Sequence, residues 1–169
     1  TTAVAPVACA ALLGLAPVAG GPTLVVRQAI DPTVSGNVLA FARQAGAVVV
    51  RPAGGSDVVY PDASQPALSG EYLAYVDDQG IRVVRWQNGT EVTRIADASA
   101  SRPALDWPNL AYVRRGSERR RLILRDLVGG EAERPASVAL NVDLGRPSLR
   151  HGRLALRAAR GIRAAGGPF

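Results

Sequence analysis

Residues 65–86, QPALSGEYLAYVDDQGIRVVRW, have the pattern of a strand, a tight turn and a second strand. Apolar residues dominate the two flanking runs, whereas Asp77-Asp78-Gln79-Gly80 between them consists of residues that favour turns. If the same arrangement recurs at a fixed spacing, it indicates a repeat fold, in which function belongs to the surface that the stacked units share.

The arrangement occurs four times, and each copy can be counted from a proline without gaps. An apolar residue lies two positions after the proline, and an apolar stretch with a central alanine lies seven to nine positions after it. The copies are Pro32 with Val34 and Leu39-Ala40-Phe41, Pro66 with Leu68 and Leu73-Ala74-Tyr75, Pro103 with Leu105 and Leu110-Ala111-Tyr112, and Pro147 with Leu149 and Leu154-Ala155-Leu156. Such self-similarity predicts a repeat architecture.

Further strands are expected after these stretches. The next strand should lie near Ala47, Ile81 and Ile162, and near Leu122 in the third copy, which carries a four-residue insertion. Tight turns are expected at Asn88-Gly89 and Gly129-Gly130. Outer strands are expected at Val58-Val59-Tyr60, Val92-Thr93-Arg94-Ile95 and Ser137-Val138-Ala139-Leu140. Each unit is therefore predicted to be an antiparallel meander of three or four strands.

Meanders of this length match the blades of a β-propeller, so the predicted fold class is all-β. Because blades stack face to face, their strands are expected to read as continuous apolar runs, as LAYV and VVV do. We expect the recurring alanine on the innermost strands, where convergence on the axis leaves little room. A β-sandwich and a β-solenoid are alternatives, but a sandwich needs no fixed-offset repeat and solenoid rungs are usually shorter.

Residues 22–169 are predicted to form a partial propeller of about three and a half blades, with repeats at about 31–64, 65–101, 102–145 and 146–169. Residues 23–27 could supply an outer strand that closes the ring. Because propellers usually have four to eight blades, we expect an incomplete ring that is part of a larger one. A four-bladed closure is the alternative.

The copies resemble TolB-type β-propeller repeats. The matching positions are Pro66, Leu68, Ser69, Gly70 and Leu73-Ala74-Tyr75, and likewise Pro32, Val34, Ser35, Gly36 and Leu39-Ala40-Phe41. The resemblance covers roughly residues 31–169, although the turn is two residues shorter and lacks the aspartate of the family's Pro-Asp-Gly turn. It implies a binding scaffold, usually outside the cytoplasm, that contacts other proteins. Some relatives, such as prolyl oligopeptidases, carry a propeller beside a catalytic domain.

Residues 1–21 are apolar and carry no charged side chain. They resemble the hydrophobic region of a secretory signal peptide, with Ala19-Gly20-Gly21 as a small-residue cleavage region. Cys9 does not fit a lipoprotein cysteine, because the apolar run follows it. A short membrane anchor and a buried strand pair are the alternatives. We therefore expect an exported protein, located in the periplasm, outside the cell or at the cell envelope.

The composition limits the chemistry that the chain can carry. Cys9 is the only cysteine and His151 the only histidine, which excludes an internal disulfide and an ordinary His/Cys zinc site. The nucleophile pattern Gly-x-Ser-x-Gly does not occur, and His151 is expected in a solvated turn. The sequence therefore predicts no catalytic site, no metal and no cofactor.

Aspartates precede each anchor proline, at Asp31, Asp62, Asp97 and Asp143. The links between blades lie on one rim of a propeller, so these carboxylates could form a ring around the channel mouth. Such a ring would bind a cation or a basic segment of a partner protein. Aspartate is also a common turn residue, which is the alternative explanation.

Basic side chains flank the first turn of the third copy, at Arg114, Arg115, Arg119, Arg120 and Arg121. We expect this turn on the opposite rim, where the cluster could bind phosphate or carboxylate groups. A solvated hairpin, with Glu118 and Asp126 as ion-pair partners, is the alternative. Nucleic-acid binding is not expected, because Tyr112 is the one aromatic residue near the cluster. Trp86 is expected to pack between blades, and Trp107 to be partly exposed.

These observations predict a non-enzymatic, exported propeller scaffold that binds a protein or an envelope component through its blade-connecting loops. Two alternatives remain open. The chain could be the propeller part of a larger, peptidase-like hydrolase, or it could bind a polyanion or nucleic acid through the arginine cluster. The net charge of +6 permits acidic partners, but because all basic residues are arginine, a GC-rich genome would explain the charge equally well.

Overall fold

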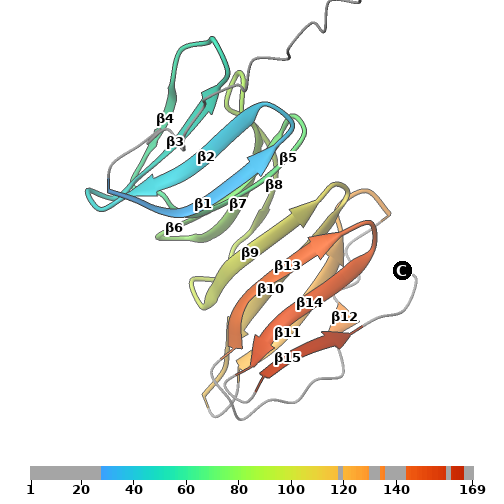
Figure 1. Ribbon diagram of the computed structural model, residues 1–169. Coiled ribbons are helices and arrows are strands. Elements are labelled where there is room, and N and C mark those ends of the chain that lie inside the picture. Colours follow the sequence, from blue (N-terminus) through green and yellow to red (C-terminus); the bar gives the residue numbers. More distant parts are fainter. Residues whose placement is uncertain (1–27, 118–119, 130–133, 136–143, 159–160, 166–169) are drawn as a thin grey trace, which may run out of the picture.

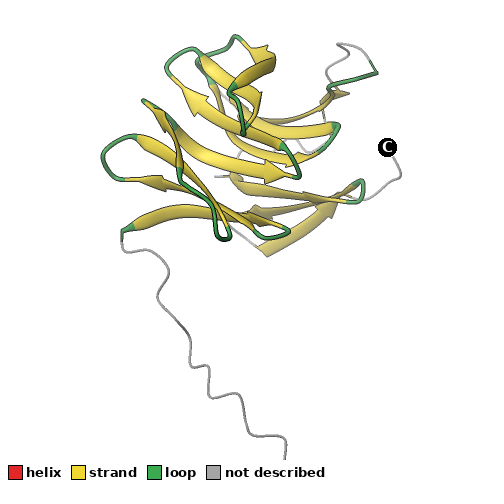
Figure 2. Cartoon of the chain, turned by 90° about the horizontal axis from the view of Figure 1, so that it is seen from above, coloured by secondary structure: helices red, strands yellow, loops and turns green. Residues whose placement is uncertain are grey.

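The computed structural model describes residues 28–117, 120–129, 134–135, 144–158 and 161–165. In this part of the chain all regular structure is β-strand, arranged in four antiparallel sheets that follow one another along the sequence (Figures 1 and 2). The first sheet contains β1 (Ala29–Ser35), β2 (Val38–Arg43), β3 (Ala47–Pro52) and β4 (Val58–Pro61). The second contains β5 (Ser64–Ser69), β6 (Tyr72–Asp77), β7 (Gly80–Arg85) and β8 (Thr90–Ile95).

The third sheet contains β9 (Ala100–Asp106), β10 (Asn109–Arg115), β11 (Arg120–Asp126) and the short β12 (Arg134–Pro135). The fourth contains β13 (Leu144–Arg150), β14 (Arg153–Ala158) and β15 (Gly161–Ala165). In every sheet each strand pairs with the next along the chain, so each sheet is a simple meander. The predicted all-β fold of propeller blades is therefore confirmed, and we call the sheets the first to fourth blades.

The first strand of each blade is the inner one. β1 contacts β5, β5 contacts β9, and β9 contacts β13, so the inner strands follow one another around a common axis. All four carry a register shift at or immediately before the anchor proline. Because proline has no N–H to donate, the hydrogen-bond ladder breaks there and a bulge takes its place. The recurring proline thus marks the bend of each inner strand.

The residues before three of these prolines have left-handed backbone conformations, with φ of 49° at Asp31, 52° at Gln65 and 57° at Arg102. Two nearby hydroxyls stabilise the bend in the same way. Ser64 and Ser101 each donate a hydrogen bond of 3.4 Å to a main-chain carbonyl of the neighbouring strand. The repeat seen in the sequence is therefore also a repeat of local geometry.

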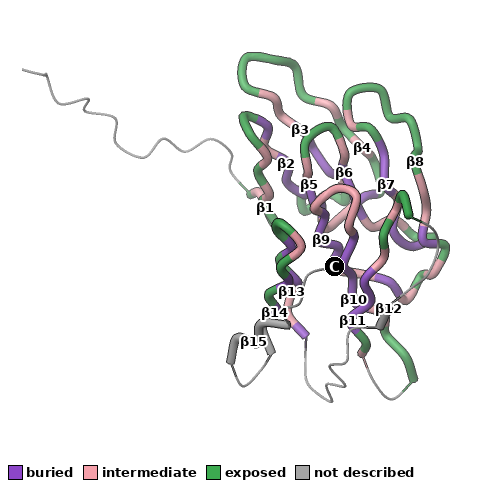
Figure 3. Tube along the Cα trace, turned by 90° about the vertical axis from the view of Figure 1, so that its right-hand side faces the viewer, coloured by how far each residue is buried: buried purple, intermediate pink, exposed green. Residues whose placement is uncertain are grey.

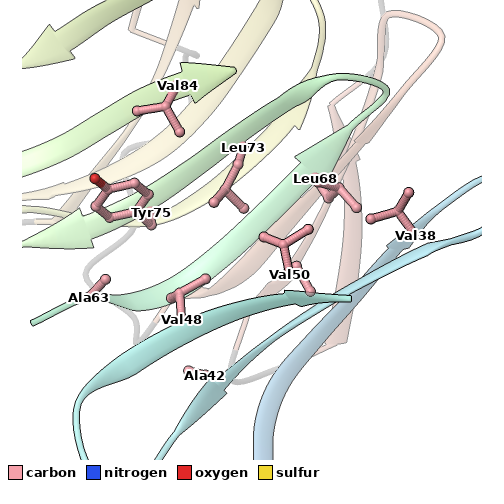
Figure 4. Close-up of a cluster of buried hydrophobic side chains, with 10 residues drawn as sticks. Val38, Ala42, Val48, Val50, Ala63, Leu68, Leu73, Tyr75 and Val84 are labelled. Atoms are coloured by element: carbon pink, nitrogen blue, oxygen red, sulfur yellow. The ribbon is translucent and has the colours of Figure 1, made fainter. Parts of the chain in front are cut away.

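Three hydrophobic clusters join successive blades. The cluster between the first and second blades includes Val48, Val50, Leu73 and Tyr75 (Figure 4). A second cluster joins the second and third blades, and a third joins the third and fourth. Buried residues run along the middle of the strands, while the turns are exposed (Figure 3). Burial on facing surfaces explains why the strands read as apolar runs.

The recurring alanine does not lie on the innermost strands, so that expectation was wrong. Ala40, Ala74, Ala111 and Ala155 lie on β2, β6, β10 and β14, one strand further out. Their cross-strand partners on the inner strands are also small: Thr33, Ala67, Ala104 and Ser148. The first three alanines are fully buried. These three alanines belong to the hydrophobic clusters between neighbouring blades, whereas Ala155 and its partner Ser148 are exposed.

Hydrogen bonds connect the ends of the first three inner strands to the next blade. The Ser35 hydroxyl accepts from the Gly70 N–H at 2.9 Å, and the Ser69 hydroxyl accepts from the Trp107 N–H at 3.0 Å. Asp106 occupies the equivalent position in the third blade and accepts from the Gly152 N–H at 3.4 Å. We call these three contacts the inter-blade latches.

The remaining strand predictions divide into two groups. The expected outer strands at 58–60 and 92–95 are confirmed as β4 and β8, and the strands near Ala47, Ile81, Leu122 and Ile162 are confirmed as β3, β7, β11 and β15. The predictions for residues 1–21, 23–27 and 137–140 concern segments outside the described residues. The four described sheets are compatible with an incomplete ring.

Candidate functional site

The two rims of the stack are set by the strand order. One rim, here the link rim, carries the links between blades, such as residues 96–99, together with the β6–β7 and β10–β11 turns. The other, here the turn rim, carries the β5–β6, β9–β10 and β13–β14 turns. Because the strands alternate in direction, the link that precedes β9 and the β10–β11 turn lie on the same rim.

The structure therefore overturns the expectation that the aspartates and the arginine cluster lie on opposite rims. Arg114 Nε lies 2.7 Å from Asp97 Oδ2, and the Arg115 N–H donates to the Ser99 carbonyl at 3.0 Å. Asp97 Oδ1 also accepts from the Ser99 N–H at 2.9 Å and from its hydroxyl at 2.6 Å. The pKa of Asp97 is lowered, first by these Ser99 hydrogen bonds and then by Arg114.

The other predicted aspartates have different surroundings. Asp31 lies at the bulge of β1, with its carboxylate 4.0 Å from the guanidinium of Arg146. Asp62 is exposed in the link between the first and second blades, with φ of 53°. Asp143 lies outside the described residues. Asp31, Asp62 and Asp97 thus differ in their partners and in their exposure.

The arginine cluster lies on facing strands of one hairpin. Arg115 pairs with Arg120 and Arg114 with Arg121 across β10 and β11. Arg114 also donates to the Tyr112 hydroxyl at 3.2 Å, and Arg115 and Arg121 are exposed. Arg119 and Glu118 lie outside the described residues. Asp126, an expected partner, lies at the other end of β11, where it accepts from the N–H groups of Val128 and Gly129.

An aromatic surface on the turn rim was not predicted as a site. The Tyr72 and Trp107 rings come from the second and third blades and stack with centroids 3.7 Å apart and an interplanar angle of 8°. The Arg85 guanidinium lies 5.9 Å from the Tyr72 ring centroid. Leu127 donates its N–H to the Pro108 carbonyl at 2.9 Å, which places Val128, 69% exposed, beside the same turn. We call Tyr72, Arg85, Trp107 and Val128 the aromatic patch.

The sequence predicts that Trp107 lies in a turn and is partly exposed, and this prediction is confirmed because its side chain is half-buried. The stacking of Trp107 on Tyr72 was not predictable from the repeat, because the two residues occupy different positions within their copies. Trp86 packs between the first and second blades as expected. Its indole N–H donates to the Gly70 carbonyl at 3.0 Å, and its own carbonyl accepts from the Tyr60 hydroxyl at 2.8 Å.

A cavity of about 420 Å³ lies on the axis, lined by residues of all four inner strands. Arg146 reaches across it from β13. Its Nε donates to the Pro103 carbonyl at 3.4 Å, its Nη1 donates to the Asp31 carbonyl at 3.5 Å, and its Nη2 donates to the Pro66 carbonyl. One guanidinium thus contacts the other three blades, and burial lowers the pKa of Arg146.

Within the described residues, no group of three His, Cys, Asp or Glu side chains is arranged to hold a metal ion. His151 is exposed in the β13–β14 turn, with φ of 50°. Across the described part of the chain, no helix is long and apolar enough to cross a membrane.

No protein-family model matches the chain, and a search of curated proteins gives no match. Solved structures show the fold. The computationally designed Ika4 protein matches with a TM-score of 0.63 at 12% identity, over 84% of this chain and 94% of that one. The designed Ika8 protein matches at 0.60 and 11% identity, over 80% of this chain. BamB from Moraxella catarrhalis matches at 0.56 and 14% identity, over 79% of this chain.

The chain spans 45% of the Ika8 chain and 41% of the BamB chain, and thus less than half of each. At these identities the likeness shows the fold alone. Together with the four meander sheets, it defines the chain as a protein built of β-propeller blades.

Proposed function

We propose that the chain is a non-enzymatic, exported propeller scaffold of the TolB type that binds a protein or a cell-envelope component through its strand-connecting loops. The export part of the proposal is supported by the apolar character of residues 1–21. The TolB-type part is supported by the Pro-x-apolar-Ser-Gly pattern of the first two copies.

The observation that carries the proposal is the aromatic patch. Tryptophan, tyrosine and arginine are the residues most enriched among those that dominate binding energy at protein interfaces. Here all three lie together on the turn rim, with a valine that is 69% exposed beside them. Trp107 and Tyr72 are stacked before any partner binds, so ordering them costs little conformational entropy. A rigid aromatic surface of this kind favours a protein partner.

The position of the patch also favours this function. It joins the loops of two blades that the Ser69 latch and a hydrophobic cluster hold together. Rigid strands therefore support the loops that present the patch, which is the usual arrangement of binding sites on β-scaffolds.

The test compares two charge reversals on opposite rims. The tagged full chain is incubated with envelope extracts of its host, and bound proteins are identified by mass spectrometry. Arg85→Glu alters the aromatic patch, whereas Arg115→Glu alters the link rim at an exposed position of the arginine cluster. We expect a saturable protein partner that is lost with Arg85→Glu and kept with Arg115→Glu. Loss with Arg115→Glu alone would place binding on the link rim, and absence of any protein partner would contradict the scaffold function.

A further inference from the structure

The wall of the axial cavity follows the repeat. The apolar residue two positions after each anchor proline lines it in every blade, and we call this set the aliphatic ring: Val34, Leu68, Leu105 and Leu149. Thr33 and Ser148 add hydroxyl groups to the wall. A volume of about 420 Å³ whose wall combines these aliphatic side chains with polar groups has the features of a small-molecule site.

Arg146 supplies the charge of this cavity. Its side chain is 28% exposed and its guanidinium is held by three main-chain carbonyls. Carbonyl groups orient a guanidinium without neutralising it. The Asp31 carboxylate, which is 45% exposed, lies at 4.0 Å, beyond the distance of a charge-assisted hydrogen bond. Arg146 is therefore a fixed, partly desolvated cation whose nearest anion in the described part of the chain is the Asp31 carboxylate at 4.0 Å.

A cation in this state favours an anionic ligand. Guanidinium has five N–H donors, and three of its hydrogen bonds go to the carbonyls, so donors remain for a further acceptor. An anion that enters the cavity meets a cation already held in place, and low exposure strengthens the attraction between them. The residues of the aliphatic ring follow the anchor prolines on the inner strands, whereas Arg146 precedes its proline. The ring therefore favours a hydrocarbon group attached to the anion that Arg146 binds.

We propose that the axial cavity binds a small aliphatic carboxylate, with its carboxylate on Arg146 and its hydrocarbon chain inside the aliphatic ring. This site is separate from the aromatic patch, and it does not depend on the proposed scaffold function. Its position makes all four blades contribute to one ligand.

Calorimetric titration of the full chain with hexanoate, hexan-1-ol and hexylamine tests the proposal, because the three probes share a chain and differ in charge. We expect saturable one-to-one binding of hexanoate and binding of the alcohol and the amine that is weaker by about tenfold or more. Arg146→Gln should weaken hexanoate binding by about tenfold or more and leave hexanol binding unchanged. Equal binding of the three probes by the wild type, or hexanoate binding that Arg146→Gln leaves intact, would overturn the proposal.

Arg146 also connects the blades, so its substitution could unfold the chain. A second variant therefore blocks the cavity without changing Arg146. Val34 is 65% exposed and belongs to none of the three hydrophobic clusters, so Val34→Trp should fill the cavity in a folded chain. The control is Val59→Trp, at a position on β4 that is 51% exposed. We expect hexanoate binding to be lost with Val34→Trp and kept with Val59→Trp, and its retention in Val34→Trp would contradict the proposal.

Discussion

Gly80, the first residue of β7, lies against the main-chain carbonyl of Ile95, the last residue of β8. Gly80 has a φ of 133°, and a Cβ atom there would lie 2.8 Å from the Asp97 nitrogen and closer still to the Ile95 oxygen. The turn that ends in Gly80 is therefore also the point where the backbone of the second blade meets the link to the third. Glycine is required there by conformation and by space.

Gly80→Ala should consequently lower the free energy of unfolding by about 2 kcal/mol or more, because both strain and a backbone clash oppose the methyl group. Urea denaturation of the full chain measures this change. Gly89→Ala is the matched control, because Gly89 also has a left-handed φ, of 70°, but has open space around its Cβ position. Its cost should be only about 1 kcal/mol, and equal costs for the two variants would contradict the close approach.

The inter-blade latches should contribute measurable stability. Ser69→Ala removes the hydroxyl that accepts from the Trp107 N–H and leaves a half-buried donor without that acceptor. We expect a loss of about 1 kcal/mol in urea denaturation. Ser56→Ala, at an exposed position before β4, should change the free energy of unfolding by less than about 0.5 kcal/mol. Equal effects would show that the latch adds no stability.

The blade pattern could be predicted because it depends on spacing within one repeat. Pro66, Leu68 and Leu73 each keep a fixed offset in every copy, and the structure gives each offset one geometric role. The alanine was assigned to the wrong strand, because a fixed offset identifies equivalent positions but not their distance from the axis. The inner strand is the one that carries the proline.

The aromatic patch and the Arg146 contacts could not be predicted in the same way, because each brings together residues that occupy different positions within their repeats. Tyr72 and Trp107 stack across blades, yet neither residue recurs at its position in the other copies. Arg146 precedes its anchor proline as Asp31, Gln65 and Arg102 do. Arginine thus occupies this position in two of the four copies, so the sequence alone does not distinguish Arg146 from Arg102. The rim that carries the arginine cluster, in contrast, follows from the alternating direction of successive strands alone.

The Asp97 carboxylate should make stability depend on pH. Its pKa is lowered in the folded chain, chiefly by the Ser99 hydrogen bonds, so its contribution is complete above the ordinary aspartate pKa and is lost as the pH falls through the folded pKa. Asp97→Asn should therefore lower the free energy of unfolding by about 1 kcal/mol near neutral pH and by less in acid. Urea denaturation at about pH 7 and about pH 3 measures the difference between the two proteins. A difference that stays constant between the two pH values would contradict this role.

The outward surface of the first blade should promote self-association. Val59, on the outer strand β4, is 51% exposed, and exposed apolar residues on sheets favour contact with other chains. We expect a low monomer fraction of the isolated chain in gel filtration and a higher one for Val59→Glu. The matched change Val92→Glu, on β8 where Val92 is 40% exposed, should have a smaller effect. An unchanged monomer fraction for Val59→Glu would exclude this surface as the cause.

Photo-crosslinking in the native host tests the proposed scaffold function most directly. A photoreactive amino acid is placed at Val128, in the aromatic patch, or at Val59, on the outer strand of the first blade, since both positions are exposed. The scaffold account predicts a discrete crosslinked protein from position 128 that is absent from position 59 and disappears with Arg85→Glu. No crosslinked protein from position 128, or the same product from both positions, would contradict binding through the aromatic patch.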